Sequence, residues 1–140
     1  MPVKQVIVIR SNLKNKNGDK VRTGKIASQA AHASIKFICD RLERLFDEPN
    51  ATHRFKPSAW FSKAELEWLT GSFAKVTLQV QTEEELLEIH EAAKKAGLVS
   101  SLIVDAGKTE FGGVPTKTPL AIGPDESSKI DKITGHLSLY

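Results

Sequence analysis

Apolar residues recur with two different periods along this chain, and the periods predict both strands and helices. Residues 6–9 are an uninterrupted β-branched run, which is typical of a strand covered on both faces. Residues 75–80 alternate between polar and apolar positions, and residues 98–104 form a third strand-like run. Residues 118–122 predict a short fourth strand, in which Pro119 fits only an edge, a bulge or the start.

The spacing of apolar residues predicts a long first helix that starts near Thr23 and ends near residues 49–50. Residues 47–61 look irregular, with two exposed-looking aromatics, Trp60 and Phe61. Capping and turn patterns give the remaining boundaries: a helix from Ser62 to about Thr70, a helix from Thr82 to Gly97, a turn at Gly123-Pro124, and a last helix capped by Asp125 or Ser127 that runs through Ile133.

The order of these elements predicts an α/β fold. Strands that alternate with helices favour a three-layer α/β/α sandwich with a mixed, mostly parallel four-stranded sheet. A length of 140 residues predicts one domain that spans residues 1–140.

The net charge of +3 hides a marked asymmetry along the chain. Residues 1–45 hold ten Lys and Arg against three Asp and Glu, whereas the remaining residues hold ten against fourteen. Four basic residues gather before the first helix: Lys14, Lys16, Lys20 and Arg22. Such a patch attracts polyanions and favours binding to a phosphate backbone, although a solvated loop would carry the same residues.

The remaining composition narrows the class of protein further. The sequence has no apolar run long enough to span a membrane. Its one cysteine, Cys39, lies in an apolar helical pattern, so we expect a structural thiol and a reducing, cytoplasmic setting. The four histidines lack metal-ligand spacing, and neither a Walker motif nor a Gly-x-Ser-x-Gly motif occurs. We therefore predict no metal and no cofactor.

Two segments carry candidate chemistry. Lys25, Gln29 and His32 are spaced to share one face at the start of the long helix. Asp105 follows the third strand, so the two segments meet at one sheet edge if their strands run the same way. Each group also has an ordinary interpretation: Lys25 as a solvated lysine, and Asp105 as the cap of a turn.

Several motifs together resemble the peptidyl-tRNA hydrolase family found mainly in archaea and eukaryotes. The resemblance covers residues 4–40 and 74–140, and these residues carry it: Gly24-Lys25, Ala27, Gln29, His32-Ala33, the run from Asp105 to Thr109, Thr116-Lys117-Thr118, Gly123-Pro124, and the run from Ile130 to Leu137. In this chain Glu110 stands where the family usually has glutamine, and residues 44–70 look longer than the corresponding segment.

The resemblance implies hydrolysis of the ester that joins a peptide to tRNA. Asp105 is then expected to orient or deprotonate a water molecule, and Lys25, Thr109 and Thr118 to steady the developing negative charge. Thr116 is a weaker candidate of the same kind, and Gln29 and His32 are candidates for support or for binding the terminal adenosine. Lys14, Lys16, Lys20 and Arg22 are expected to hold tRNA phosphates. The resemblance also suggests a homodimer.

Two other functions fit the sequence. One is a binding module that contacts RNA or protein on the same fold without catalysis, which Glu110 and the long middle segment favour. The other is an esterase or deacylase that acts on a related aminoacyl-tRNA.

Overall fold

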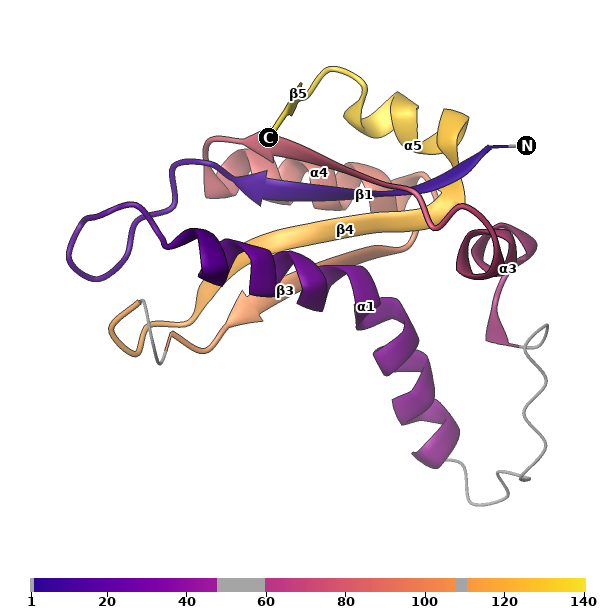
Figure 1. Ribbon diagram of the computed structural model, residues 1–140, viewed down its shortest axis with the longest axis horizontal. Coiled ribbons are helices and arrows are strands. Elements are labelled where there is room, and N and C mark those ends of the chain that lie inside the picture. Colours follow the sequence, from indigo (N-terminus) through magenta and orange to yellow (C-terminus); the bar gives the residue numbers. More distant parts are fainter. Residues whose placement is uncertain (1, 48–59, 108–110) are drawn as a thin grey trace.

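The computed structural model describes residues 2–47, 60–107 and 111–140, which form an α/β fold (Figure 1). Its elements are β1 (Val3–Arg10), α1 (Thr23–Asp47), α3 (Lys63–Thr70), β2 (Lys75–Val80), α4 (Glu83–Lys95), β3 (Ser100–Asp105), β4 (Thr116–Glu126), α5 (Ser127–Thr134) and β5 (Ser138–Leu139). No helix in these ranges is long and apolar enough to cross a membrane.

The strands form one mixed sheet in the order β3-β4-β1-β2-β5. Only β1 and β2 pair in parallel, whereas β4 pairs antiparallel with both β1 and β3, and β5 pairs antiparallel with β2. The expectation of four mostly parallel strands was therefore wrong. The direction of a strand depends on its distant partners, and a two-residue strand such as β5 has no recognisable sequence pattern.

Helices pack against both faces of the sheet, which explains the continuous apolar run in β1. Val6 and Val8 belong to a buried cluster with Leu86 of α4 and Ile130 of α5. Ile7 and Ile9 belong to a second cluster, which includes Ala33 of α1. Because successive side chains of a strand point to opposite faces, the two clusters lie on opposite sides of β1.

Two of the predicted turn and cap positions differ in the structure. Gly123-Pro124 was expected to turn the chain, but it lies within β4, where Gly123 adopts φ +88° and its N–H donates to the Val99 carbonyl. The position before the last helix is Glu126, which makes no side-chain capping bond, so neither Asp125 nor Ser127 is the cap. The caps at Ser62 and Thr82 are confirmed.

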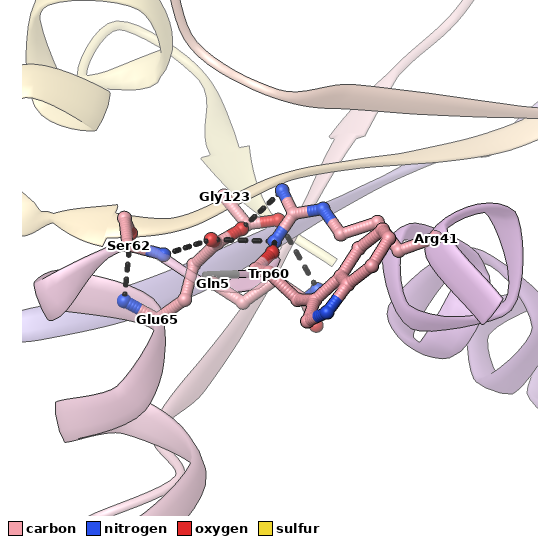
Figure 2. Close-up of polar contacts among 6 residues, drawn as sticks. All are labelled: Gln5, Arg41, Trp60, Ser62, Glu65 and Gly123. Carbon is pink, nitrogen blue, oxygen red and sulfur yellow. Dashed lines mark hydrogen bonds and ion pairs between the residues drawn. The ribbon is translucent and has the colours of Figure 1, made fainter. Parts of the chain in front are cut away.

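A buried ion pair joins the C-terminal half of α1 to α3 (Figure 2). The Arg41 guanidinium donates to both carboxylate oxygens of Glu65, over 2.6 and 2.7 Å. The same carboxylate accepts from the N–H of Ser62, which closes the capping box of α3. Trp60 and Phe61 are half-buried rather than exposed, and the Trp60 carbonyl accepts a further bond from Arg41.

Candidate functional site

The strand directions bring three separate parts of the chain to one edge of the sheet. Because β4 is antiparallel to both β1 and β3, these two strands run in the same direction and end at the same edge. The loops that follow β1 and β3 lie together there, and β4 begins there (Figure 1). The two loops are close, since a Cβ built on Gly112 would lie 3.4 Å from the Cβ of Lys16.

An ion pair between Lys25 and Asp105 forms the centre of the candidate site. Lys25 Nζ lies 2.7 Å from Asp105 Oδ2, and the two side chains are 14% and 9% exposed. Gln29, one turn further along α1, donates from Nε2 to the same oxygen. The N–H of Gly107 donates to Asp105 Oδ1 over 2.7 Å, so Asp105 also caps its own turn. Asp105 therefore caps its own turn and is also the partner of Lys25.

The surroundings of Asp105 keep its carboxyl ionised. Burial by itself raises its pKa, but the bonds from Lys25, Gly107 and Gln29 and the positive charge of Lys25 outweigh burial, so the pKa lies below its ordinary value of 3.8. A carboxylate accepts about four hydrogen bonds, and these donors occupy three of those positions. The remaining acceptor position is on Oδ1.

Thr118 extends this network into the protein. Its hydroxyl lies 3.2 Å from Gln29 Oε1 and 3.3 Å from the Ile103 carbonyl, within donating distance of both. The residue is 1% exposed. Since Oε1 of Gln29 faces this hydroxyl, its Nε2 is directed toward Asp105.

A small pocket lies beside the network, between β1, α1 and the start of β4. Its polar lining comes from Arg10, Lys25, Gln29 and Thr118, and the apolar lining from Ile9, Leu13, Val21, Ile26, Phe111 and Pro119. The space open to the centre of a water molecule is about 20 Å³. One water needs roughly 10–15 Å³ measured in this way.

The other sequence-predicted site residues lie in different places. His32 is exposed on α1 and makes none of the contacts of the Asp105 network. The Thr116 hydroxyl donates to the Val114 carbonyl over 2.9 Å. Thr109 lies outside the described residues. The basic residues before α1 are all exposed: Lys14, Lys16, Lys20 and Arg22.

The basic residues belong to an ordered loop that adjoins the pocket. Lys14 and Lys20 form an antiparallel bridge, and Asn15 Oδ1 accepts from the N–H groups of Asn17 and Asp19. Val21, which follows Lys20, is buried and lines the pocket. This anchoring places the loop's positive charges at the sheet edge that carries Asp105.

Sequence reasoning missed two residues of this region, Arg10 and Phe111. Arg10 ends β1, and Phe111 is 7% exposed in the loop after β3. Arg10 was detectable as a charged residue directly after an apolar strand, but Phe111 follows a polar run without any pattern. Cys39, expected to be structural, is exposed. Among the described residues no three His, Cys, Asp or Glu side chains gather in a way that could hold a metal ion.

Comparison with known proteins assigns the class of this chain. The family model of peptidyl-tRNA hydrolase PTH2 matches residues 3–140, and the chain belongs to this family. The peptidyl-tRNA hydrolase of Methanothermobacter thermautotrophicus is 43% identical over 98% of this chain and 99% of its own length. That of Methanopyrus kandleri is 42% identical over 97% of both chains.

Two further similarities are more distant. The probable peptidyl-tRNA hydrolase 2 of Dictyostelium discoideum is 34% identical over 98% of this chain and 54% of its own length. A solved structure of a protein of unknown function from Agrobacterium tumefaciens strain C58 superposes with a TM-score of 0.56. It covers 100% of this chain and 98% of that one at 14% identity, so it supports the fold alone.

Proposed function

We propose that the network around Asp105 is where this chain hydrolyses peptidyl-tRNA, the activity for which its family is named. The observation that carries the proposal is the contact of 2.7 Å between Lys25 and Asp105, which come from distant parts of the chain. The contact lies at the sheet edge that also bears the basic loop, so phosphate binding and ester chemistry would be adjacent.

Each group of the network has a role that its contacts support. Asp105 stays ionised at neutral pH, and its depressed pKa makes it a weak base, so it orients the attacking water through its remaining acceptor position on Oδ1. The Lys25 ammonium stabilises the oxyanion of the tetrahedral intermediate. Gln29 and Thr118 hold Asp105 in place, since the Thr118 hydroxyl faces Gln29 and Gln29 donates to the carboxylate. Thr109 remains a candidate for stabilising the same oxyanion through its hydroxyl.

Release of labelled peptide from peptidyl-tRNA tests these roles. We expect Asp105→Asn and Lys25→Ala each to lose at least about 100-fold in kcat while remaining folded. A matched control is the double variant Lys36→Ala/Asp40→Asn, which removes another ion pair of α1, one with side chains 35% and 48% exposed. The control should retain full activity. Full activity in either site variant would refute the mechanism.

The same assay separates the alternative functions. A protein that binds peptidyl-tRNA without releasing peptide would be a binding module. Hydrolysis of free aminoacyl esters in preference to N-blocked ones would indicate a deacylase. None of the contacts made by the described residues of the site favours either alternative.

We propose that the basic loop binds the phosphates of tRNA. Replacing Lys14, Lys16, Lys20 and Arg22 with Gln should raise KM, leave kcat nearly unchanged, and reduce the salt dependence by about 0.7–0.9 in log–log slope for each lost phosphate contact. Lys94→Gln/Lys95→Gln on α4 is the control for loss of positive charge. An unchanged KM and salt slope in the loop variant would contradict this role.

We also propose that the chain forms a homodimer. An apolar groove between α1 and α3 supports it, because Ile35 and Phe73 on its rim are 52% and 50% exposed. Light scattering should give twice the mass of the chain, and Ile35→Glu should reduce that mass to one chain. A single-chain mass for the unaltered protein would refute the proposal.

Three further expectations stay proposals: one domain over residues 1–140, a layered α/β/α sandwich, and a cytoplasmic location. The first is supported by one sheet that takes strands from Val3 to Leu139, and the second by helices on both faces of β1. The tRNA substrate implied by the family supports the third. A single cooperative unfolding transition, seen identically by two probes, would test the first of these.

A further inference from the structure

Strand β3 forms one border of the sheet and ends at Asp105. The described strands run in the order β3-β4-β1-β2-β5, so β3 pairs with β4 on one side only, and β5 forms the opposite border (Figure 1). A border strand carries a row of main-chain N–H and C=O groups that can pair with another chain. Because β3 leads directly into Asp105, a chain paired along it would reach the proposed hydrolytic site.

The two borders differ in how they are protected against such pairing. Natural edge strands are commonly very short, or carry lysine or proline. Strand β5 has only two residues, whereas β3 has six and contains neither Lys, Arg nor Pro. Val99, just before β3, is 36% exposed, and Val104 within it is 55% exposed. Strand β3 therefore has the features of an unprotected, partly apolar edge.

The contacts between β3 and β4 identify the main-chain groups of β3 that face outward. The Gly123 N–H donates to the Val99 carbonyl over 2.9 Å, and the Thr118 hydroxyl lies 3.3 Å from the Ile103 carbonyl. Residues 99 and 103 thus face β4 with their main-chain groups, and successive strand residues alternate in this respect. Three residues of β3 therefore direct their N–H and C=O groups away from β4: Ser100, Leu102 and Val104.

The one irregularity in this pairing leaves β3 regular. Leu102 pairs with Leu120 and Val104 pairs with Lys117, so two steps along β3 are set against three along β4. The extra residue of this bulge is on β4. The outward groups of β3 consequently keep the even spacing that an added strand requires.

We infer that the peptide portion of peptidyl-tRNA binds along the outer edge of β3 as an added strand. This inference rests on the proposed function, which places the ester carbonyl at Asp105. That carbonyl belongs to the C-terminal residue of the peptide, so the preceding residues run back from Asp105 toward Ser100, parallel to β3. The tRNA leaves the ester toward the basic loop after β1, on the other side of β4. Main-chain bonds do not depend on side chains, so this edge accepts peptides of unrelated sequence.

Dependence of hydrolysis on peptide length tests the inference. Since β3 has six residues, kcat/KM of the unaltered protein should rise with peptide length and level off at about six residues. A hexapeptidyl-tRNA should be hydrolysed about 10-fold more efficiently than an N-acetylaminoacyl-tRNA with the same C-terminal residue and the same tRNA, because a few net main-chain hydrogen bonds give a factor of this size. Equal kcat/KM for the two substrates would overturn the inference.

Val104→Pro removes an outward N–H of β3 and leaves the bonds to β4 in place. It should lower the preference for the hexapeptidyl substrate, the ratio of the two kcat/KM values, by about 3- to 10-fold. A general disturbance of the site would change both values together and leave this ratio unaltered, which would contradict the inference.

Leu139→Pro on β5 is the matched control at the opposite border. The Tyr140 N–H donates to the Thr77 carbonyl, so by the same alternation the N–H of Leu139 faces away from β2. Leu139 is 71% exposed. The control therefore loses an equivalent outward N–H and should keep the full preference for the longer peptide.

N-methylated substrates test the unaltered protein, so this measurement does not depend on whether a proline variant folds. A single N-methyl group is moved along the hexapeptide at constant length and side chains. Only alternate residues of an added strand donate to β3, so N-methylation should lower kcat/KM by about 3- to 10-fold at every second position and have little effect between them. A uniform effect, or none, would refute pairing along β3.

Two further outcomes separate this inference from the other proposals. Failure of the unaltered protein to hydrolyse either substrate would count against the proposed function, whereas hydrolysis of both without a length preference would count against this inference alone. Light scattering tests a second copy of the chain as the occupant of the edge. A mass of two chains for the unaltered protein and of one chain for Val104→Pro would make β3 a seam between copies and exclude the peptide from it.

Discussion

Removal of the Glu65 carboxylate should destabilise the fold far more than removal of other charges on α3. Glu65→Ala deletes both bonds to the Arg41 guanidinium and the acceptor for the Ser62 N–H. Glu65 and Arg41 are only 4% and 15% exposed, so little water can replace the lost partner. Removing one member of a buried pair costs roughly 3–5 kcal/mol, because the other charge stays buried without compensation.

The expected cost lies toward the lower end of this range. Arg41 keeps its bond to the Trp60 carbonyl, and its guanidinium lies 5.4 and 5.3 Å from the ring centroids of Phe37 and Phe61. The lost capping bond adds about 1 kcal/mol. We therefore expect Glu65→Ala to lower the free energy of unfolding by about 3–4 kcal/mol, and Tm by roughly 10–15 °C for a domain of this size.

Urea unfolding followed by circular dichroism measures this change. Glu67→Ala removes an exposed carboxylate from the same helix and should alter stability by less than about 0.5 kcal/mol. In a double-mutant cycle, Arg41→Ala/Glu65→Ala should cost less than the sum of the two single variants, because the second substitution removes the stranded charge. A loss below about 1 kcal/mol for Glu65→Ala, or strict additivity in the cycle, would refute the reasoning.

Three further predictions concern Gly107 and two titrating groups. Gly107→Ala should lower the free energy of unfolding by at least about 2 kcal/mol and remove most of the activity, since φ is +81° and the new Cβ would lie 2.1 Å from the Val114 carbonyl oxygen. Gly18→Ala is the control, because Gly18 has a similar φ of +79° but no atom within 4 Å of the new Cβ. It should lower the free energy of unfolding by only about 1 kcal/mol in the same urea assay. Because the pKa of Asp105 is depressed, its ionised form stabilises the fold above pH 3.8. The difference in free energy of unfolding between the unaltered protein and Asp105→Asn should therefore shrink as the pH falls through the folded-state pKa. A difference that does not change with pH would contradict this. Burial lowers the pKa of His90, so the neutral imidazole stabilises the fold. Its contribution to the free energy of unfolding should be complete above pH 6.5 and should be lost as the pH falls through the folded-state pKa. The free energy of unfolding of His90→Gln should not show this loss.

Local patterns predicted most of the helices and strands because each boundary depends on nearby residues. Ser62 and Glu65 specify a helix start within four positions, and the structure contains both reciprocal bonds. The run of residues 6–9 predicted a strand covered on both faces, and its side chains are buried on both sides. Gly123-Pro124 was misjudged because the pair usually turns a chain, whereas here the sheet extends through it.

The pairing of the strands could not be predicted in this way. Strand β4 lies between β1 and β3, and its antiparallel direction is set by partners on both sides. The meeting of Lys25 with Asp105 was predicted on the condition that β1 and β3 run the same way. The two strands do so without being neighbours. Arg10 was detectable as a charged residue after an apolar run, but its place in the pocket wall and its bond to the Lys117 carbonyl depend on β4, a distant part of the chain.

The central position of β4 has a consequence for when this protein becomes able to act. Lys25 and Asp105 both precede β4 in the chain, so a growing polypeptide contains both residues before it contains the strand that joins β1 to β3. The two side chains can be held together only once residues 116–126 have been made and have paired with both strands.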